Sequence, residues 1–574
     1  MFKLFRFLKP YKVGVSAVII FMLLQSLAQL YLPTLLADIV DIGVVKGDVP
    51  YILKFGAYML IVALSAGVCV VIASYLLARA ATGFGRDLRR SVFAHVESFS
   101  LGEFDKLGTS SLITRTTNDI AQVQQVIVMM RMFIGAPTML VGGVIMAVYK
   151  DFNLALVLIA IIPILAISII AIMRKGIPLF KALQVKIDQI NLVLRENLTG
   201  IRVIRAFNRS EHEQHKFEKA NRDYTQTAIK VNNIMATMMP LMMLVFNLGV
   251  VVILWYGGIR IDNNQMQIGD LMAFIQYAMQ IMFSMFMMTM IFVMIPRASA
   301  SAVRINEVLN MESIVRNPES AKTLPRGRGA VEFHQVSFSY PGAEQPAIRD
   351  ISFRAEPGEV TAIIGGTGSG KTTLINLLLR FYDVDSGRIE VGGEPLKSLD
   401  LDSLREAIGY VPQKAVLFSG TFADNIRYGR EEANETEILH AAQIAQAAEF
   451  IQEMKDSFQS VLAQGGTNLS GGQKQRLSIA RALARKPSIY VFDDSFSALD
   501  FKTDAKLRAA LKAETKDATM IIVAQRVSTI MDADRILVLE DGRIAGMGTH
   551  AELMKSCKVY QEIVASQLSE EEIA

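Results

Sequence analysis

Six long apolar stretches constrain the fold of this chain more than any other feature of its sequence. They lie at residues 13–36, 54–78, 132–149, 152–173, 234–256 and 271–295. Each is close to the ~20 residues that an α-helix needs to cross the hydrocarbon core of a bilayer. Lipid offers no partners to backbone N–H and C=O groups, so helices that satisfy these groups internally can cross it. The sequence therefore predicts a helical domain with six membrane spans.

Basic residues are distributed unevenly between the segments that connect these stretches. Residues 174–231 hold twelve lysines and arginines and residues 79–126 hold six, whereas 37–53, 150–151 and 257–270 hold one each. Cytoplasmic loops carry the excess of Lys and Arg, so both long loops and both termini are predicted in the cytoplasm. The long loops keep a helical pattern and should extend the spans as stalks. They break at residues 107–109 and 198–201, where a short helix that transmits movement and a plain helical hairpin both remain open.

The chain has 574 residues, which is too long for one hydrophobic core. We expect a transmembrane domain over residues 1–310, a polar linker over 311–330 and a second, α/β domain over 331–574, whose first strands are expected at 331–340 and 348–355. The formal net charge of +4 gives no indication of a nucleic-acid partner. Two cysteines, Cys69 and Cys557, cannot form a disulfide framework, which agrees with a reducing cytoplasm.

The stretch from Gly365 to Thr372 reads Gly-Gly-Thr-Gly-Ser-Gly-Lys-Thr and follows an apolar run at 360–364. Glycines at this spacing let successive backbone N–H groups converge on phosphate oxygens, which a Cβ would obstruct. Lys371 adds a positive charge for the β- and γ-phosphates, and the Thr372 hydroxyl can ligate Mg²⁺. The helix expected after Gly370 points the positive end of its dipole at the same anion. The sequence therefore predicts a site for a nucleoside triphosphate.

Two further motifs follow the phosphate loop. Residues 489–493 form an apolar run that ends in Asp493, which is typical of a buried strand whose carboxylate holds Mg²⁺ through water. Between the phosphate loop and this strand, the sequence Leu-Ser-Gly-Gly-Gln at 469–473 stands at the start of a helix expected over 474–484. The N-terminus of that helix is a second expected anion-binding site. With these motifs in this order behind six spans, the whole chain resembles a half-size bacterial exporter of the ABC transporter family.

This resemblance implies a fold, ligands and site residues. The fold is an α-helical six-span transmembrane domain followed by an α/β P-loop ATPase domain, and the ligands are ATP and Mg²⁺. The implied nucleotide-binding residues are Tyr340, which matches the aromatic residue that stacks on adenine, Gly365, Gly366, Thr367, Gly368, Ser369, Gly370, Lys371, Thr372, Thr373, Gln413 and Asp493. Of these, Thr372, Gln413 and Asp493 (the last through water) would hold the metal.

The resemblance also implies a second nucleotide-binding domain. Two such domains bind head to tail in this family, so Ser470, Gly471, Gly472 and Gln473 would act on ATP bound to a partner chain. Asp500 lies in the loop that crosses between the two domains, and the breaks near residues 107 and 199 would be coupling helices. A single nucleotide-binding domain in this sequence means that the transporter must dimerise.

Two positions depart from the family pattern. Asp494 stands where a catalytic Glu usually follows the acid-ended strand, and Gln525 stands where a His usually follows the strand at 520–523. The shorter Asp displaces its carboxylate by about 1 Å, which can cost ~10²-fold in rate. Gln can donate to a phosphate but cannot carry a proton as imidazole does. The chain is therefore expected to hydrolyse its own ATP slowly and to pair with a homologous half-transporter that keeps Glu and His. A homodimer with two weak sites is the alternative.

The implied activity is ATP-driven export across the bacterial cytoplasmic membrane. Methionines crowd the last two expected spans, among them Met238, Met242 and Met285, and they suit either a cavity for varied hydrophobic compounds or ordinary packing. Efflux of hydrophobic drugs is the first expectation for the cargo, and lipid or peptide export is the alternative. A non-pumping, ATP-gated regulatory module is a hypothesis of another class. The expected partners are membrane lipid, a hydrophobic substrate and the second half-transporter, without nucleic acid.

Overall fold

The structure, a computed structural model, describes residues 1–325, 327 and 329–567, except for the side chains of Phe2, Met290, Phe292 and Val293. Residues 326 and 328 of the expected linker, and 568–574 of the expected nucleotide-binding domain, lie outside the described residues. The chain forms two compact units. The first comprises Met1–Val96 and Ser110–Asn310, and the second comprises Glu97–Thr109 and Met311–Ala574.

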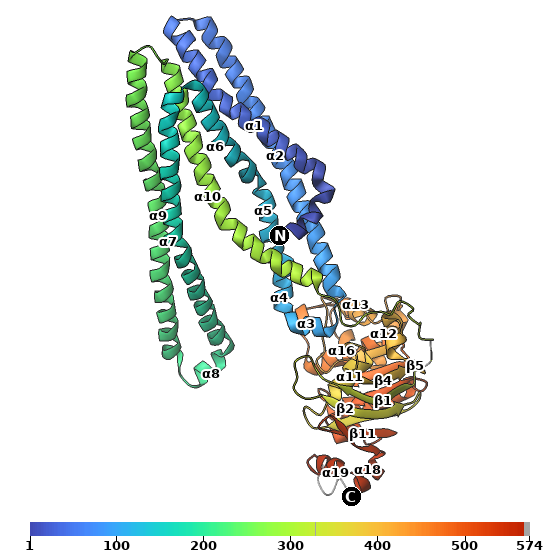
Figure 1. The fold of residues 1–574 in the computed structure, drawn as a ribbon. Coiled ribbons are helices and arrows are strands. Elements are labelled where there is room, and N and C mark those ends of the chain that lie inside the picture. Colours follow the sequence, from blue (N-terminus) through green and yellow to red (C-terminus); the bar gives the residue numbers. More distant parts are fainter. Residues whose placement is uncertain (326, 328, 568–574) are drawn as a thin grey trace. The chain divides into compact units, whose positions relative to one another are not determined.

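The first unit is built from long helices (Figure 1). Within the described residues, six helical segments are long and apolar enough to cross a membrane, as the sequence predicts. They are Lys3–Val44, Val49–Glu97, Thr109–Lys150, Phe152–Thr199, Ser210–Asp262 and Ile268–Asn310. Their α-helical elements are α1 (Lys12–Asp38), α2 (Val49–Glu97), α4 (Thr109–Thr114), α5 (Ile120–Val128), α6 (Met130–Lys150), α7 (Phe152–Thr199), α9 (Ser210–Asp262) and α10 (Ile268–Asn310).

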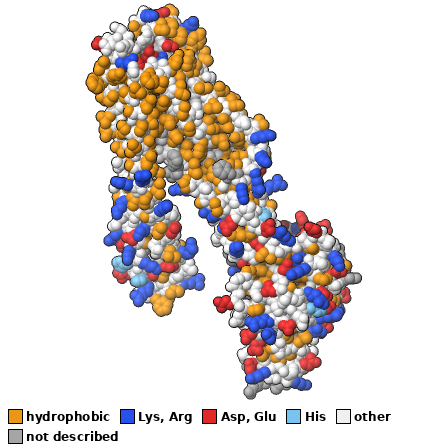
Figure 2. All heavy atoms as spheres, in the orientation of Figure 1, with side chains coloured by type: hydrophobic (Ala, Val, Ile, Leu, Met, Phe, Trp, Pro, Cys, Tyr) orange, Lys and Arg blue, Asp and Glu red, His pale blue; other side chains and the backbone are white. Residues whose placement is uncertain are grey.

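Several of these helices are far longer than the bilayer requires. Helix α9 has 53 residues, which corresponds to roughly 80 Å at the α-helical rise. Figure 2 shows hydrophobic side chains over the upper part of the helical unit and charged side chains over its lower end, where α7 and α9 approach the short helix α8 (Ile201–Ala206). The long loops of the sequence are therefore helical stalks.

The methionines of the last two spans are packed inside the helical unit. Met238 and Met242 of α9 and Met285 of α10 are buried and form a cluster with Leu165 of α7. Unbranched thioethers fill such irregular spaces well. In this structure these three methionines contribute to helix packing.

The described residues of the second unit form two main sheets. One has the order β2-β1-β4-β5 and is antiparallel, with β1 at Val331–Phe338, β2 at Ile348–Ala355, β4 at Ser386–Val391 and β5 at Glu394–Pro395. The other has the order β12-β11-β3-β10-β9-β6. Its strands are β3 (Val360–Gly365), β6 (Ile408–Val411), β9 (Ile489–Asp493), β10 (Thr519–Val523), β11 (Arg535–Glu540) and β12 (Arg543–Gly548), and only β12 runs antiparallel to its neighbour.

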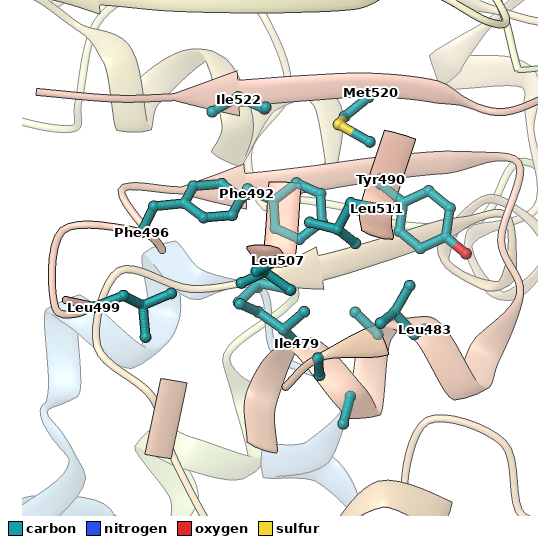
Figure 3. Close-up of a cluster of buried hydrophobic side chains, with 14 of the residues drawn as sticks. Ile479, Leu483, Tyr490, Phe492, Phe496, Leu499, Leu507, Leu511, Met520 and Ile522 are labelled. Carbon is teal, nitrogen blue, oxygen red and sulfur yellow. The ribbon is translucent and has the colours of Figure 1, made fainter. Parts of the chain in front are cut away.

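Helices cover the six-stranded sheet and share its core. Among them are α11 (Lys371–Leu378), α16 (Gly471–Arg485) and α17 (Phe501–Glu514). Figure 3 shows side chains of α16 and α17 meeting those of β9 and β10, and Ile479, Phe492 and Leu507 there are fully buried. Burial of such a side chain contributes roughly 1.5–3 kcal/mol, so this core fixes the ends of the strands that carry the site.

The second unit includes a short helix from the N-terminal half of the sequence. Helix α3 (Leu101–Leu107) ends at Gly108, whose φ of 74° suits glycine, and it belongs to the same compact unit as the two sheets. The expected boundaries assign residues 97–109 to the transmembrane domain because sequence order gives no sign of this contact. Sequence alone identifies the break at 107–109, and the structure identifies what the helix before it contacts.

Candidate nucleotide-binding site

The order of the parallel strands brings three distant motifs to one edge of the sheet. Strand β10 lies between β3 and β9, with Met520 opposite Val360 and Ile521 opposite Val491. Parallel strands end at the same edge, which is where ligands bind in such sheets. The phosphate loop after β3, the two acids at the end of β9 and Gln525 after β10 therefore meet in one place.

An open pocket of about 340 Å³ lies at this edge. This volume is within the range of small-molecule sites in proteins, roughly 300–1,000 Å³. Its lining includes eleven of the residues expected from the sequence: Tyr340, Thr367, Gly368, Gly370, Lys371, Thr372, Thr373, Gln413, Asp493, Asp494 and Gln525. Ala347 and Val523 line it as well, although no motif pointed to them. The pocket is formed by the second unit alone.

The phosphate loop has the backbone that its glycines predict. Gly368 and Gly370 adopt positive φ angles of 83° and 98°. A Cβ on Gly370 would lie 2.6 Å from Ile348 Cγ2 and 2.9 Å from the Ala347 carbonyl oxygen, so this position has no space for a side chain. Helix α11 begins at Lys371, directly after the loop, and presents its free N–H groups and positive dipole end there.

Lys371 lies across the loop that precedes it. Its Nζ donates to the carbonyl oxygens of Gly365 at 2.8 Å and Gly366 at 2.7 Å, and the buried Ser369 Oγ is 3.5 Å away. Burial lowers the pKa of the Lys371 amine, and the carboxylates of Asp494 and Asp493 oppose this change. The ammonium group is thus held among acceptors that a phosphate could replace.

Two adjacent acids face the phosphate loop. Asp493 is 3% exposed, and burial raises its pKa to about 6, with a further contribution from Asp494 and opposing effects of Thr372 and Lys371. Asp494 is 8% exposed, and its φ of 47° lies in the left-handed region, which Asp adopts more readily than most residues. Gln413 Nε2 donates to Asp494 Oδ2 at 3.2 Å. The acid that replaces the expected Glu therefore contacts the glutamine expected near the metal.

The donor atoms around this point fit Mg²⁺. The Thr372 side chain lies near enough to the Asp493 carboxylate to oppose the rise of its pKa. Gln413 uses its amide nitrogen toward Asp494, which leaves its amide oxygen available. Mg²⁺ prefers hydroxyl, carboxylate, carbonyl and water oxygens. Thr372, Gln413 and Asp493 would hold the ion, and the bound ion would neutralise phosphate charge.

Tyr340 lines the same pocket. Its hydroxyl is 3.1 Å from Thr373 Oγ1, and its ring meets the ring of Phe338 edge to face at a centroid distance of 5.0 Å. Tyr340 is one of the residues that line the pocket, so a nucleotide base in the pocket can stack on its ring.

Gln525 lies in an exposed turn after β10 and has a partner that no motif indicated. Gln567, just after helix α19 (Lys558–Ala565), donates from Nε2 to the Gln525 carbonyl oxygen at 2.7 Å, and its Oε1 accepts from the Val527 N–H at 2.8 Å. One amide therefore fixes both sides of the turn. Only the folded chain brings the two segments together, so sequence reasoning had no signal for it.

The signature residues lie apart from this pocket. Ser470 begins α16, and its Oγ accepts from the Gln473 N–H at 3.2 Å while Gln473 Oε1 accepts from the Ser470 N–H at 2.9 Å. Ser470 and Gly471 are exposed, and neither they nor Gly472 and Gln473 are among the pocket-lining residues. Asp500 is exposed and begins α17, where its carboxylate accepts from the Thr503 N–H at 2.9 Å. Both helix ends are open to a partner.

The fold and the site define a multi-pass membrane protein that carries a P-loop nucleotide-binding domain. Residues 15–285 match the ABC transporter transmembrane region, and residues 348–497 match the ABC transporter domain. An uncharacterized ABC transporter ATP-binding protein of Mycobacterium tuberculosis is 44% identical over 98% of this chain and 97% of its own length. The ATP-dependent lipid A-core flippase of Vibrio parahaemolyticus is 30% identical over 99% of this chain and 98% of its own length.

A solved structure of a bacterial Atm1-family ABC exporter with ATP bound has a TM-score of 0.81 and 26% identity, and the likeness covers 97% of this chain and 99% of that one. The chain belongs to the ABC transporter family, with the architecture of a half-size exporter. Membership implies an ATPase coupled to transport, and half-size members of this family generally dimerise.

Proposed function

We propose that this chain is one half of a heterodimeric exporter that uses ATP to move hydrophobic or amphiphilic small molecules out through the bacterial cytoplasmic membrane. The proposal of a heterodimer rests on the observation that Asp494 and Gln525 both line the pocket around the phosphate loop. Hydrolysis requires a base at position 494 and a proton-carrying side chain at position 525. These positions hold an Asp, which is shorter than Glu, and a Gln, which carries an amide. The signature sequence, by contrast, is complete, and its Ser470 and Gly471 are exposed.

In this proposal the chain's own site binds ATP and turns it over slowly. The contact between Gln413 and Asp494 keeps that carboxylate near the metal ligands rather than extended toward an attacking water. Loss of a positioned base typically costs ~10²–10⁴-fold in rate. The partner chain supplies a Glu and a His for the second site, where Ser470 to Gln473 of this chain would contact the nucleotide.

An amphiphilic cargo agrees with the cargo named for the Vibrio relative, a lipid A-core. The spans of this chain expose large apolar side chains such as Leu64, Val71 and Ile167, so the helical unit is compatible with molecules that enter from lipid. Drug-like hydrophobic compounds remain within the same chemical class.

Mg-ATP hydrolysis by the purified chain in lipid nanodiscs tests the degenerate site. We expect wild type to be nearly inactive and Asp494→Glu combined with Gln525→His to raise turnover by about 10²-fold. Lys371→Ala in each background is the negative control for hydrolysis. Mass spectrometry confirms that no partner chain co-purifies. Fast wild-type turnover that Lys371→Ala abolishes would contradict the heterodimer.

Transport is tested separately in sealed vesicles that contain this chain and its partner. ATP-dependent accumulation of a fluorescent amphiphile is expected when the nucleotide-binding domains face outward. A nucleotide-dependent conformational change without any flux would instead favour the regulatory module.

A further inference from the structure

A row of aromatic rings leads from the nucleotide pocket to helix α3. Tyr340 lines the pocket, and its ring meets the ring of Tyr382 at a centroid distance of 5.4 Å and an interplanar angle of 87°. Phe338 contacts both rings, at 5.0 Å from Tyr340 and 5.4 Å from Tyr382. The two pairs that include Tyr340 are edge to face, which is a preferred geometry for aromatic rings, and the Phe338–Tyr382 pair is tilted. The position of each ring therefore depends on its neighbours.

Tyr382 connects this row to α3 through a hydrogen bond. Its side chain is 7% exposed, and its hydroxyl donates to Asp105 Oδ2 at 2.6 Å. The ring also lies beside Gly102, where an added Cβ would be 3.5 Å from Tyr382 Cε1. Burial, followed by the hydrogen bond to Asp105, raises the pKa of the Tyr382 hydroxyl above its usual value, so Tyr382 keeps the proton that it donates.

Helix α3 has a second contact within the same unit. Glu103 Oε2 accepts from the Ser100 N–H at 2.7 Å, and Glu103 Oε1 accepts from the Ile314 N–H at 3.2 Å. Helix α3 follows α2, which ends at Glu97, and precedes α4, which begins at Thr109. Residues 98–100 and Gly108 therefore connect α3 along the chain to two helices of the membrane unit.

We propose that Tyr382 is a positioning residue that reports the occupancy of the adenine side of the pocket to α3. The link runs from Tyr340 through the ring of Tyr382 to the Asp105 carboxylate. The inference rests on the nucleotide site proposed above, and it adds a specific route by which that site acts on α3. A base stacked on Tyr340 fixes the Tyr340 ring, which orders the Tyr382 ring and its hydrogen bond to Asp105.

Hydrogen exchange of the full chain in nanodiscs, with and without Mg-ATP, tests this route. We expect ATP to slow amide exchange in residues 101–108 of wild type on the order of tenfold, as expected when a hydrogen bond to a charged group is secured. Tyr382→Phe keeps the ring and removes the donor, so the ATP effect on residues 101–108 should disappear while affinity for a fluorescent ATP analogue is unchanged.

Tyr560→Phe is the matched control, because it removes a hydroxyl that lies 2.8 Å from His550 Nδ1 in the same unit. It should leave the ATP effect on residues 101–108 intact. Asp105→Asn is the second variant, and combined with Tyr382→Phe it should add nothing to either single change.

Three results would overturn the proposal. A Tyr382→Phe chain that retains the ATP effect excludes the hydrogen bond as the route. An ATP analogue that binds wild type without any change in residues 101–108 excludes the link and leaves the nucleotide site intact. Failure of the analogue to bind wild type overturns both the link and the nucleotide site.

Discussion

Gly370 is a position in the phosphate loop where both the backbone and the surroundings oppose a side chain. Its φ is 98°, and an added Cβ would meet Ile348 Cγ2 at 2.6 Å. Gly366, in the same loop, has no atom within 4 Å of the corresponding position and no positive φ. The two glycines therefore form a matched pair, one required by backbone and space and the other replaceable without a clash.

We predict that Gly370→Ala destabilises the nucleotide-binding domain by ~1–3 kcal/mol through strain and overpacking. Gly366→Ala should change the stability little. The apparent melting temperature of the purified chain measures both, at roughly 2–4 °C per kcal/mol for a domain of this size. Equal melting temperatures for the two variants would show that the loop relaxes around a side chain at position 370.

At this scale each motif in the sequence encodes local geometry, and eleven of the expected residues line one pocket. The glycine spacing, the acid at the end of β9 and the residue after β10 are all local signals. The sequence could not predict that Gln413 contacts Asp494, 81 positions away, or that Gln567 fixes the turn at Gln525. Such contacts depend on tertiary packing, and a solvent-exposed glutamine has no local pattern that distinguishes it.

Substitution of the residue that caps helix α16 tests whether the signature acts on a partner or only stabilises its own helix. Ser470 forms a reciprocal cap with Gln473, and Thr549 forms the same kind of cap with Glu552 at the start of α18 (His550–Ser556). Removal of either cap by Ala substitution should cost ~1 kcal/mol of stability. Only the Ser470 hydroxyl is expected to contact a nucleotide held by another chain.

We therefore predict that Ser470→Ala lowers ATP turnover of the assembled transporter by ~10-fold or more, since a hydrogen bond to a charged group contributes about 1.5–3 kcal/mol. Thr549→Ala should leave turnover near the wild-type value. Steady-state ATPase assays of the chain co-purified with its partner provide the measurement. Equal turnover in the two variants would mean that Ser470 serves only as a helix cap.

Elements were easier to predict than their contacts. Hydropathy located six spans, and the same helical pattern in polar loops indicated the stalks. Helix α3 is the instructive exception, because only its break near Gly108 is encoded locally. Its hydrogen bond from Tyr382 joins residues 277 positions apart, and no periodicity reaches across such a separation.

For the whole molecule, the distribution of charge implies an orientation in the membrane. The turn after α8 and the turn after α9 provide comparable probes. Asn208 and Asn264 lie in these turns, are exposed and adopt similar φ angles of 53° and 55°. Arg202, Arg205 and Arg209 surround the first turn, so the positive-inside rule places it in the cytoplasm and the second turn outside.

We predict that a membrane-impermeant maleimide labels Asn264→Cys in intact cells and labels Asn208→Cys only after the cells are permeabilised. The background chain carries Cys69→Ala and Cys557→Ala, which removes both native thiols. Because both new cysteines replace an exposed Asn with a similar backbone, a difference in labelling reports the side of the membrane rather than local strain. Labelling of Asn208→Cys in intact cells would show that the topology is inverted. The nucleotide-binding domain would then lie outside the cytoplasm, away from cytoplasmic ATP.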